Sequence, residues 1–151
     1  MVHPVNPPSV VPLVEIAPAP WTKAEIVDHV RILMNEIGQE PIIVRKEIDG
    51  FILNRLQGAL LNEAMRLIAD GYVSTEDLDK TVKHGLGLRW SFMGPMETID
   101  INAPGGIPDY SQRYGPIYLQ VAKDAEPRPW DNRLFGQADR DRRSILSMND
   151  H

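Results

Sequence analysis

The residues best suited to chemistry stand at the start of the sequence, in the segment MVHPVNPPSVVPLVEI. His3 is followed by Asn6 after three positions and by Glu15 after twelve. A carboxylate that accepts the imidazole N–H fixes the tautomer of a histidine and raises its basicity, so the other ring nitrogen can take a proton from a hydroxyl. A turn at Pro7 and Pro8 would bring the two extended segments together. The pattern is therefore typical of a general base for alcohol oxidation.

Spacing alone leaves a second interpretation of this segment open. His3 would then be a frayed terminal histidine and Glu15 a solvated side chain, since such spacings arise often by chance. The residues by themselves favour this second interpretation, so the pair is a candidate only.

Asn54 and Arg55 form a second candidate pair, one turn into a long predicted helix. Near a helix start, an asparagine side chain can reach a substrate carbonyl, and the free backbone amides favour anionic groups. The structural alternative is that Asn54 bonds a loop carbonyl while Arg55 pairs with Asp49 or Glu47. The residues leave both interpretations open.

Arg89 is the third candidate, and it stands beside Trp90 after the glycines Gly85 and Gly87. Its guanidinium could meet a substrate carboxylate in a pocket. An exposed loop is the alternative that the glycines favour.

Composition excludes several classes of protein. The chain of 151 residues has no cysteine, which removes thiol catalysis, disulfides and cysteine-based zinc sites. Its net charge of −5 argues against nucleic acid and anionic membranes as partners, because both attract clustered positive charge. No apolar run approaches the roughly 20 residues that span a bilayer. We expect a cytoplasmic protein whose partners are small molecules or a second copy of the chain.

A dinucleotide-binding loop is missing from the sequence. It contains neither G-x-G-x-x-G nor a lysine-containing phosphate loop, and its glycine pairs lack a strand before and a helix after them.

The elements that would position the first candidate residues form a small α/β unit. Six prolines among the first 20 residues disfavour helix there. Thr22 with Glu25 predicts a capping box, and Gly38 a helix stop. The pattern predicts a strand, a helix and a strand over residues 10–16, 23–37 and 41–46.

From Phe51 onward the pattern is helical, because apolar residues recur every three or four positions as far as Gly71. Ser74 with Asp77 caps a shorter helix. Gly85 and Gly87 are expected to break it. Further helices are predicted over residues 74–82, 94–103, 108–122 and 137–146.

Two motifs resemble the 3-hydroxyacyl-CoA dehydrogenase family. The stretch EIDGFILNRLQGALLNEAMRLIADG is similar to the family signature, and HPVNPPSVVPLVEI is similar to its catalytic segment. Their order along the chain is also the family's, which reverses the preference for the structural interpretation of His3. HPVNPP and HGLGLRWSFMGPMETIDINAPGG resemble the lambda-crystallin or L-gulonate 3-dehydrogenase branch.

The resemblance implies a mainly α fold. A helical C-terminal domain of the 6-phosphogluconate-dehydrogenase-like kind would follow a strand-helix-strand remnant of a Rossmann domain. The implied divisions are residues 1–48 for the remnant, 49–125 for the substrate and dimerisation domain, and 126–151 for a charged terminal arm.

The resemblance also implies roles for the candidate residues. His3 would be the general base and Glu15 its orienting partner, while Asn6 and Asn54 would bind the substrate oxygen. Arg89 is added as a substrate-binding candidate. The substrate would be a 3-hydroxyacyl-CoA thioester, a sugar acid or another 3-hydroxy acid.

NAD is the cofactor of the family, but we expect no NAD to bind this chain alone, because the resemblance places the cofactor domain ahead of Met1. The chain would then be a fragment of a longer dehydrogenase, or a half whose separate partner supplies that domain. Unpaired strand edges and apolar helix stripes predict a homodimer, with strand swapping as one route. The rival hypothesis is a non-catalytic helical dimerisation module.

Overall fold

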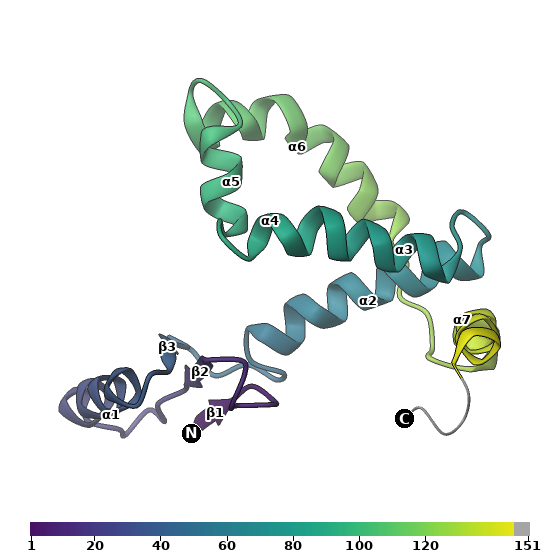
Figure 1. Cartoon of the computed structure of the whole chain (residues 1–151). Coiled ribbons are helices and arrows are strands. Elements are labelled where there is room, and N and C mark those ends of the chain that lie inside the picture. Colours follow the sequence, from purple (N-terminus) through teal and green to yellow (C-terminus); the bar gives the residue numbers. More distant parts are fainter. Residues whose placement is uncertain (147–151) are drawn as a thin grey trace. The chain divides into compact units, whose positions relative to one another are not determined.

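The computed structural model describes residues 1–146, in which helices predominate and a small three-stranded sheet lies near the N-terminus (Figure 1). This confirms the predicted fold class. Contacts divide the chain into two compact units, Met1–Ala59 and the part from Leu60 onward. No helix within residues 1–146 is both long and apolar enough to cross a bilayer.

The sheet of the first unit pairs the two ends of the opening segment. β2 lies between β1, which is antiparallel to it, and β3, which is parallel. The register sets His3 directly opposite Glu15. Pro7 accepts hydrogen bonds from the amides of Val10 and Val11, which confirms the predicted turn. The strands are β1 (Val2–Pro4), β2 (Leu13–Ile16) and β3 (Glu40–Ile43).

Helix α1 (Ala24–Glu36) connects β2 to β3. The predicted capping box is wrong: Lys23 is the N-cap residue without a side-chain bond, and the Thr22 hydroxyl instead accepts from the Ala19 amide at 3.0 Å. The helix ends as predicted at Gly38, which adopts a left-handed φ of 80°. Such a conformation suits glycine because it has no Cβ.

Both predicted strands are longer than the observed ones. The first begins only at Leu13 because residues 7–11 form the turn. The second ends at Ile43, and residues 45–46 are bent and exposed. The buried apolar residues of this unit lie on and beside these strands: Val14, Ile16, Ala17 and Val44.

The long predicted helix is α2 (Leu53–Ala69), and a tight turn at Gly50 and Phe51 precedes it. Ser74 caps the next helix, α3 (Thr75–Thr81), by accepting from the Asp77 amide at 3.1 Å as predicted.

The predicted break at Gly85 and Gly87 is wrong. The chain continues from α3 through a π-helical turn, η1 (Val82–Gly87), into α4 (Leu88–Trp90) as one ribbon (Figure 1). Gly87 has right-handed helical angles, and a Cβ there would lie 3.0 Å from the Val82 carbonyl oxygen. Here glycine permits a close approach within a helix and does not end it.

Two further helices follow near their predicted positions, α5 (Pro95–Ile101) and α6 (Gly106–Asp124). The last helix, α7 (Asn132–Ile145), starts five residues before the predicted start at residue 137. The Asp131 carboxylate caps it by accepting from the amides of Arg133 and Leu134. Burial of Leu134 and Ala138 and a 2.7 Å hydrogen bond from Thr75 to Asp141 hold α7 against α3.

Candidate active site

The first candidate pair is in contact. His3 Nδ1 lies 3.0 Å from Glu15 Oε2, with the histidine side chain 34% exposed and the glutamate fully buried. Directly opposite residues of an antiparallel pair present their side chains on one face of the sheet. The strand register thus produces the contact, because His3 is held in a paired strand and Glu15 is buried.

The second oxygen of Glu15 holds the start of α2. Oε1 accepts from the amides of Ile52 at 2.8 Å and Leu53 at 3.0 Å. Free amides at a helix start carry partial positive charge and favour an anion. This link was not predicted, because no local spacing joins positions 37 and 38 residues apart.

These contacts keep Glu15 ionised. Burial raises the pKa of the carboxyl, but the hydrogen bonds from Leu53, His3 and Ile52 outweigh burial and leave the pKa below its ordinary value. An ionised Glu15 can only accept, so His3 Nδ1 donates, and in the neutral imidazole with this tautomer the lone pair is on Nε2. The unprotonated nitrogen is the one a general base needs.

A left-handed turn aims the two amides at Glu15. Gly50 has a φ of 79° and Phe51 a φ of 47°. A positive φ is costly for a residue with a side chain. The Phe51 ring contacts the His3 ring, with the centroids 5.3 Å apart. The turn therefore places the Ile52 and Leu53 amides against Glu15 and the Phe51 ring against His3.

A cavity of about 270 Å³ opens beside His3. It brings together three of the predicted residues, His3, Asn6 and Asn54, and adds Gln57, which was not among the predicted site residues. The signal for Gln57 was its position one helical turn after Asn54. The cavity is lined by His3, Pro4, Val5, Asn6, Leu53, Asn54 and Gln57.

The side-chain amides of the cavity are available to a ligand. Within residues 1–146, those of Asn6, Asn54 and Gln57 make no hydrogen bond to the protein. Asn54 thus does not bond a loop carbonyl. Arg55 follows the structural alternative in part, since it reaches the backbone oxygen of Asp49 at 3.4 Å.

Arg89 lies in the second unit, on α4, so the expectation of an exposed loop is wrong. It lines another cavity, of about 350 Å³, with Trp90, Tyr110 and Tyr118 among its neighbours. The hydroxyls of the two tyrosines lie 2.9 Å apart. This hydrogen bond raises the pKa of Tyr110, and the positive charge of Arg89 acts in the opposite direction.

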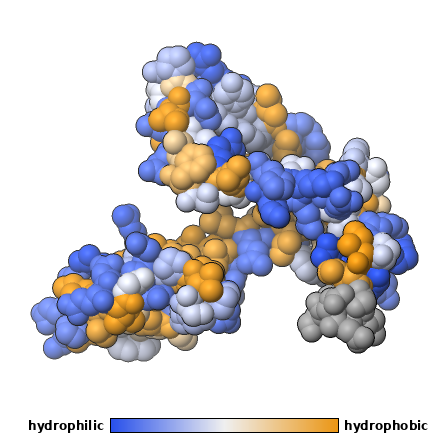
Figure 2. Space-filling model, in the orientation of Figure 1, coloured by the Kyte–Doolittle hydropathy of each residue, from blue (hydrophilic) through white to orange (hydrophobic). Residues whose placement is uncertain are grey.

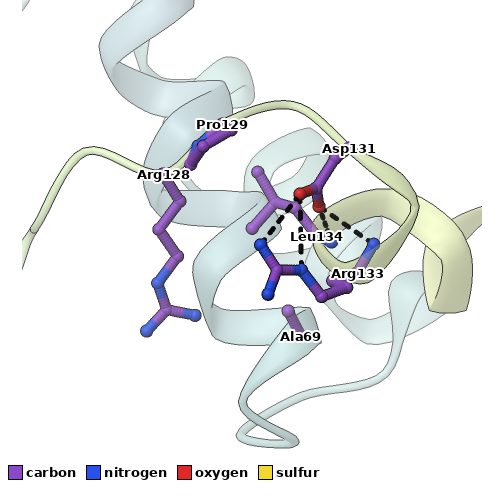
Figure 3. A pocket seen from close by; sticks show the side chains of 6 residues that line it. All are labelled: Ala69, Arg128, Pro129, Asp131, Arg133 and Leu134. Carbon is purple, nitrogen blue, oxygen red and sulfur yellow. Dashed lines mark hydrogen bonds and ion pairs between the residues drawn. The ribbon is translucent and has the colours of Figure 1, made fainter.

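A third cavity, of about 310 Å³, lies where the terminal arm meets the end of α2 (Figure 3). Its two arginines already have carboxylate partners. Arg128 makes two bonds to Asp70, at 2.7 and 2.9 Å, and Arg133 pairs with Asp131 at 3.2 Å. Both arginines therefore already pair with carboxylates of the described chain, and we assign no ligand to this cavity. Over the described part of the chain, no group of acidic and histidine side chains could hold a metal ion.

Two protein-family models match this chain, one at its N-terminal end and one over the remainder. The sequence model of the 3-hydroxyacyl-CoA dehydrogenase C-terminal domain matches residues 50–145, and that of the 3-hydroxyacyl-CoA dehydrogenase NAD binding domain matches residues 1–48.

Curated relatives are longer than this chain. Lambda-crystallin of Oryctolagus cuniculus is 50% identical over 121 residues, which are 80% of this chain and 38% of the relative. A 3-hydroxyacyl-CoA dehydrogenase of Gibberella moniliformis is 46% identical over 111 residues, 74% of this chain and 34% of the relative. The chain thus spans between a third and two fifths of the length of these relatives.

Among solved structures, 5-formyl-3-hydroxy-2-methylpyridine 4-carboxylic acid 5-dehydrogenase, described as an NAD+-dependent dismutase, superposes with a TM-score of 0.77. It is 28% identical, and the match covers 98% of this chain and 45% of that structure.

Proposed function

Because the chain belongs to the 3-hydroxyacyl-CoA dehydrogenase family, we propose that it carries the general base and the substrate-binding amides of an NAD-dependent dehydrogenase. The reaction would oxidise a 3-hydroxy acid, or its CoA thioester, to the ketone. One observation carries the proposal: a buried, ionised Glu15 orients His3 at the wall of an amide-lined cavity.

The chemistry of the proposed site is proton transfer. His3 Nε2 takes the proton of the substrate hydroxyl, and Glu15 stabilises the imidazolium that forms. Asn6 and Asn54 donate hydrogen bonds to the substrate oxygen and so hold the carbinol against the base.

The residues of this chain do not fit a dinucleotide by themselves. The connection from β2 to α1 is APAPWTK, which has prolines where a phosphate-binding turn has glycines. We therefore propose that polypeptide outside residues 1–151 supplies the NAD site, in a longer chain or in a separate partner. Residues 1–151 would form the proton-transfer half of the active site.

The substrate is proposed as either a short acyl-CoA thioester or a sugar acid. Arg89 belongs to the second unit and lines a different cavity from His3, so it does not decide between these two substrates.

The test mixes this chain with a separately expressed NAD-binding domain of a relative and follows NADH absorbance with 3-hydroxyacyl-CoA or L-gulonate. Turnover is expected, and His3→Ala should lower it by roughly 10²- to 10⁴-fold, the usual contribution of a general base. His29→Ala is the matched control, because His29 is exposed on α1. Equal rates for His3→Ala and the unmodified chain would overturn the role of His3. Micromolar binding of NAD to this chain alone, measured by calorimetry, would overturn the proposal that polypeptide outside residues 1–151 supplies the NAD site.

A non-catalytic dimerisation module is the second candidate function. It is favoured by α6, which has no buried residue although it carries several large apolar side chains. Apolar side chains reach the surface among polar ones in this part of the molecule (Figure 2). No turnover with any NAD-binding partner, together with a stable dimer, would support the module.

A further inference from the structure

Gln57 is the one polar residue of the cavity without a role in the proposed proton transfer. It lies on α2 three positions after Asn54, and residues three apart share one face of a helix. Its carboxamide is exposed and makes no hydrogen bond within residues 1–146.

The position of Gln57 suits a contact beyond the reacting hydroxyl. His3 marks the carbon that is oxidised, and Asn54 stands beside it in the cavity. Three residues advance a helix by about 4.5 Å. The Gln57 carboxamide is thus in range of a substituent one or two carbons further along the substrate.

The chemistry of a carboxamide then selects the substituent. A glutamine side chain has two N–H donors and one carbonyl acceptor. A hydroxyl or carboxyl oxygen satisfies these groups when it displaces their water, whereas an apolar chain leaves them unpaired. Apolar residues line only part of this wall, namely Pro4, Val5 and Leu53.

We propose that Gln57 is a specificity-determining residue, whose carboxamide hydrogen-bonds an oxygen substituent of the substrate near the carbinol and so favours a polyhydroxylated acid over an acid with an apolar chain. This inference rests on the proposed function.

The experiment compares two acids that differ in a single oxygen, 3-hydroxybutyrate and 3,4-dihydroxybutyrate. The chain, mixed with the NAD-binding domain, is assayed as the unmodified protein and as Gln57→Leu, Gln57→Asn and Gln112→Leu. Gln112 is the matched control, because it is an exposed glutamine of α6. Gln57→Leu should lower kcat/KM for the dihydroxy acid by about three- to tenfold, because one neutral hydrogen bond contributes about that much. The change should appear mainly as a higher KM.

The expected pattern is a change of selectivity. Gln57→Leu leaves kcat/KM for 3-hydroxybutyrate unchanged or higher, Gln57→Asn restores part of the preference, and Gln112→Leu has no effect. An equal loss with both acids would mean a structural role and would overturn the inference, as would unchanged selectivity in Gln57→Leu.

A His3→Ala control separates this inference from the proposed function. If His3→Ala retains turnover, the proposed function fails; if it abolishes turnover while Gln57→Leu keeps the preference, only the role of Gln57 fails. If the mixture shows no turnover, the inference is tested on the chain alone, by following the NMR resonances of the Gln57 side-chain amide as each acid is added. A shift with 3,4-dihydroxybutyrate but not with 3-hydroxybutyrate supports the contact, and no selective shift overturns it.

Discussion

At the scale of single residues, Glu15 performs two tasks with its two oxygens. One oxygen faces His3, and the other accepts two amides at the start of α2. An ionised carboxylate that is fully buried needs such partners, because an unpaired buried charge is strongly unfavourable. Orientation of the base and attachment of the helix therefore depend on the same group.

Glu15→Gln is expected to impair turnover more than it impairs folding. The glutamine oxygen can keep the bonds from Ile52 and Leu53, but its NH2 then faces His3 Nδ1 and favours the wrong tautomer. We expect kcat to fall by roughly 10²-fold or more. Assay of the variant beside the NAD-binding domain checks this, with circular dichroism as the folding control. A kcat within twofold of the unmodified chain would contradict the orienting role.

The pH dependence of stability should also report on Glu15. Its pKa is lowered in the folded chain from an ordinary value of 4.5, so the unfolded chain binds the proton more tightly. The stabilisation is therefore complete above about pH 4.5 and is lost as the pH falls through the folded pKa. Urea unfolding between pH 7 and pH 3 should show the unmodified chain losing stability more steeply than Glu15→Gln. Parallel curves would mean that Glu15 is not stabilised as a carboxylate.

At the scale of elements, the turn between β3 and α2 decides whether the site forms. Gly50 and Phe51 both have a positive φ, and the turn directs the amides of Ile52 and Leu53 to Glu15. The Cβ that an alanine would add at Gly50 meets no atom closer than 3.5 Å. The requirement for glycine there is thus one of backbone conformation and not of space.

Gly50→Ala should lower the free energy of unfolding by about 1–2 kcal/mol, the cost of a left-handed residue with a side chain. Gly58→Ala is the matched control, because Gly58 lies inside α2 and an added Cβ meets nothing within 4 Å. That substitution should stabilise the helix by about 0.5–1 kcal/mol. Chemical denaturation of both variants gives the comparison. A loss in Gly58→Ala as large as that in Gly50→Ala would refute the conformational explanation.

At the scale of the whole molecule, we propose a homodimer formed through α6. Five of its exposed apolar residues recur along one face, and a second copy could cover them. They are Ile107, Tyr114, Ile117, Tyr118 and Val121.

Light scattering should give a mass of twice the 17.0 kDa of one chain. Ile117→Arg places a charge on the apolar face and should shift the equilibrium to the monomer, because burial of an unpaired charge opposes association. Gln112→Arg, on the opposite face of the helix, should leave the dimer intact. A 17.0 kDa species at high concentration of the unmodified chain would exclude this dimer.

Residue types and their spacing predicted most of the helices and gave His3 and Glu15 as a candidate pair, whereas the family resemblance implied the mainly α fold and favoured the catalytic interpretation of that pair. Periodic apolar residues predicted α2 and α5, the spacing of Ser74 and Asp77 predicted a cap that is observed, and the proline turn predicted the contact of His3 with Glu15. These features are local or depend on a single turn, so they can be predicted from the spacing of residues.

The remaining features became visible only in the folded chain. There Glu15 binds the start of α2, Gln57 joins the cavity, and the chain passes Gly87 as a π-helical turn. The register of strands, the angle of a helix and the partner of a buried oxygen depend on residues far apart in the chain. Such contacts form only when the folded elements pack together, so the spacing of residues along the sequence does not reveal them.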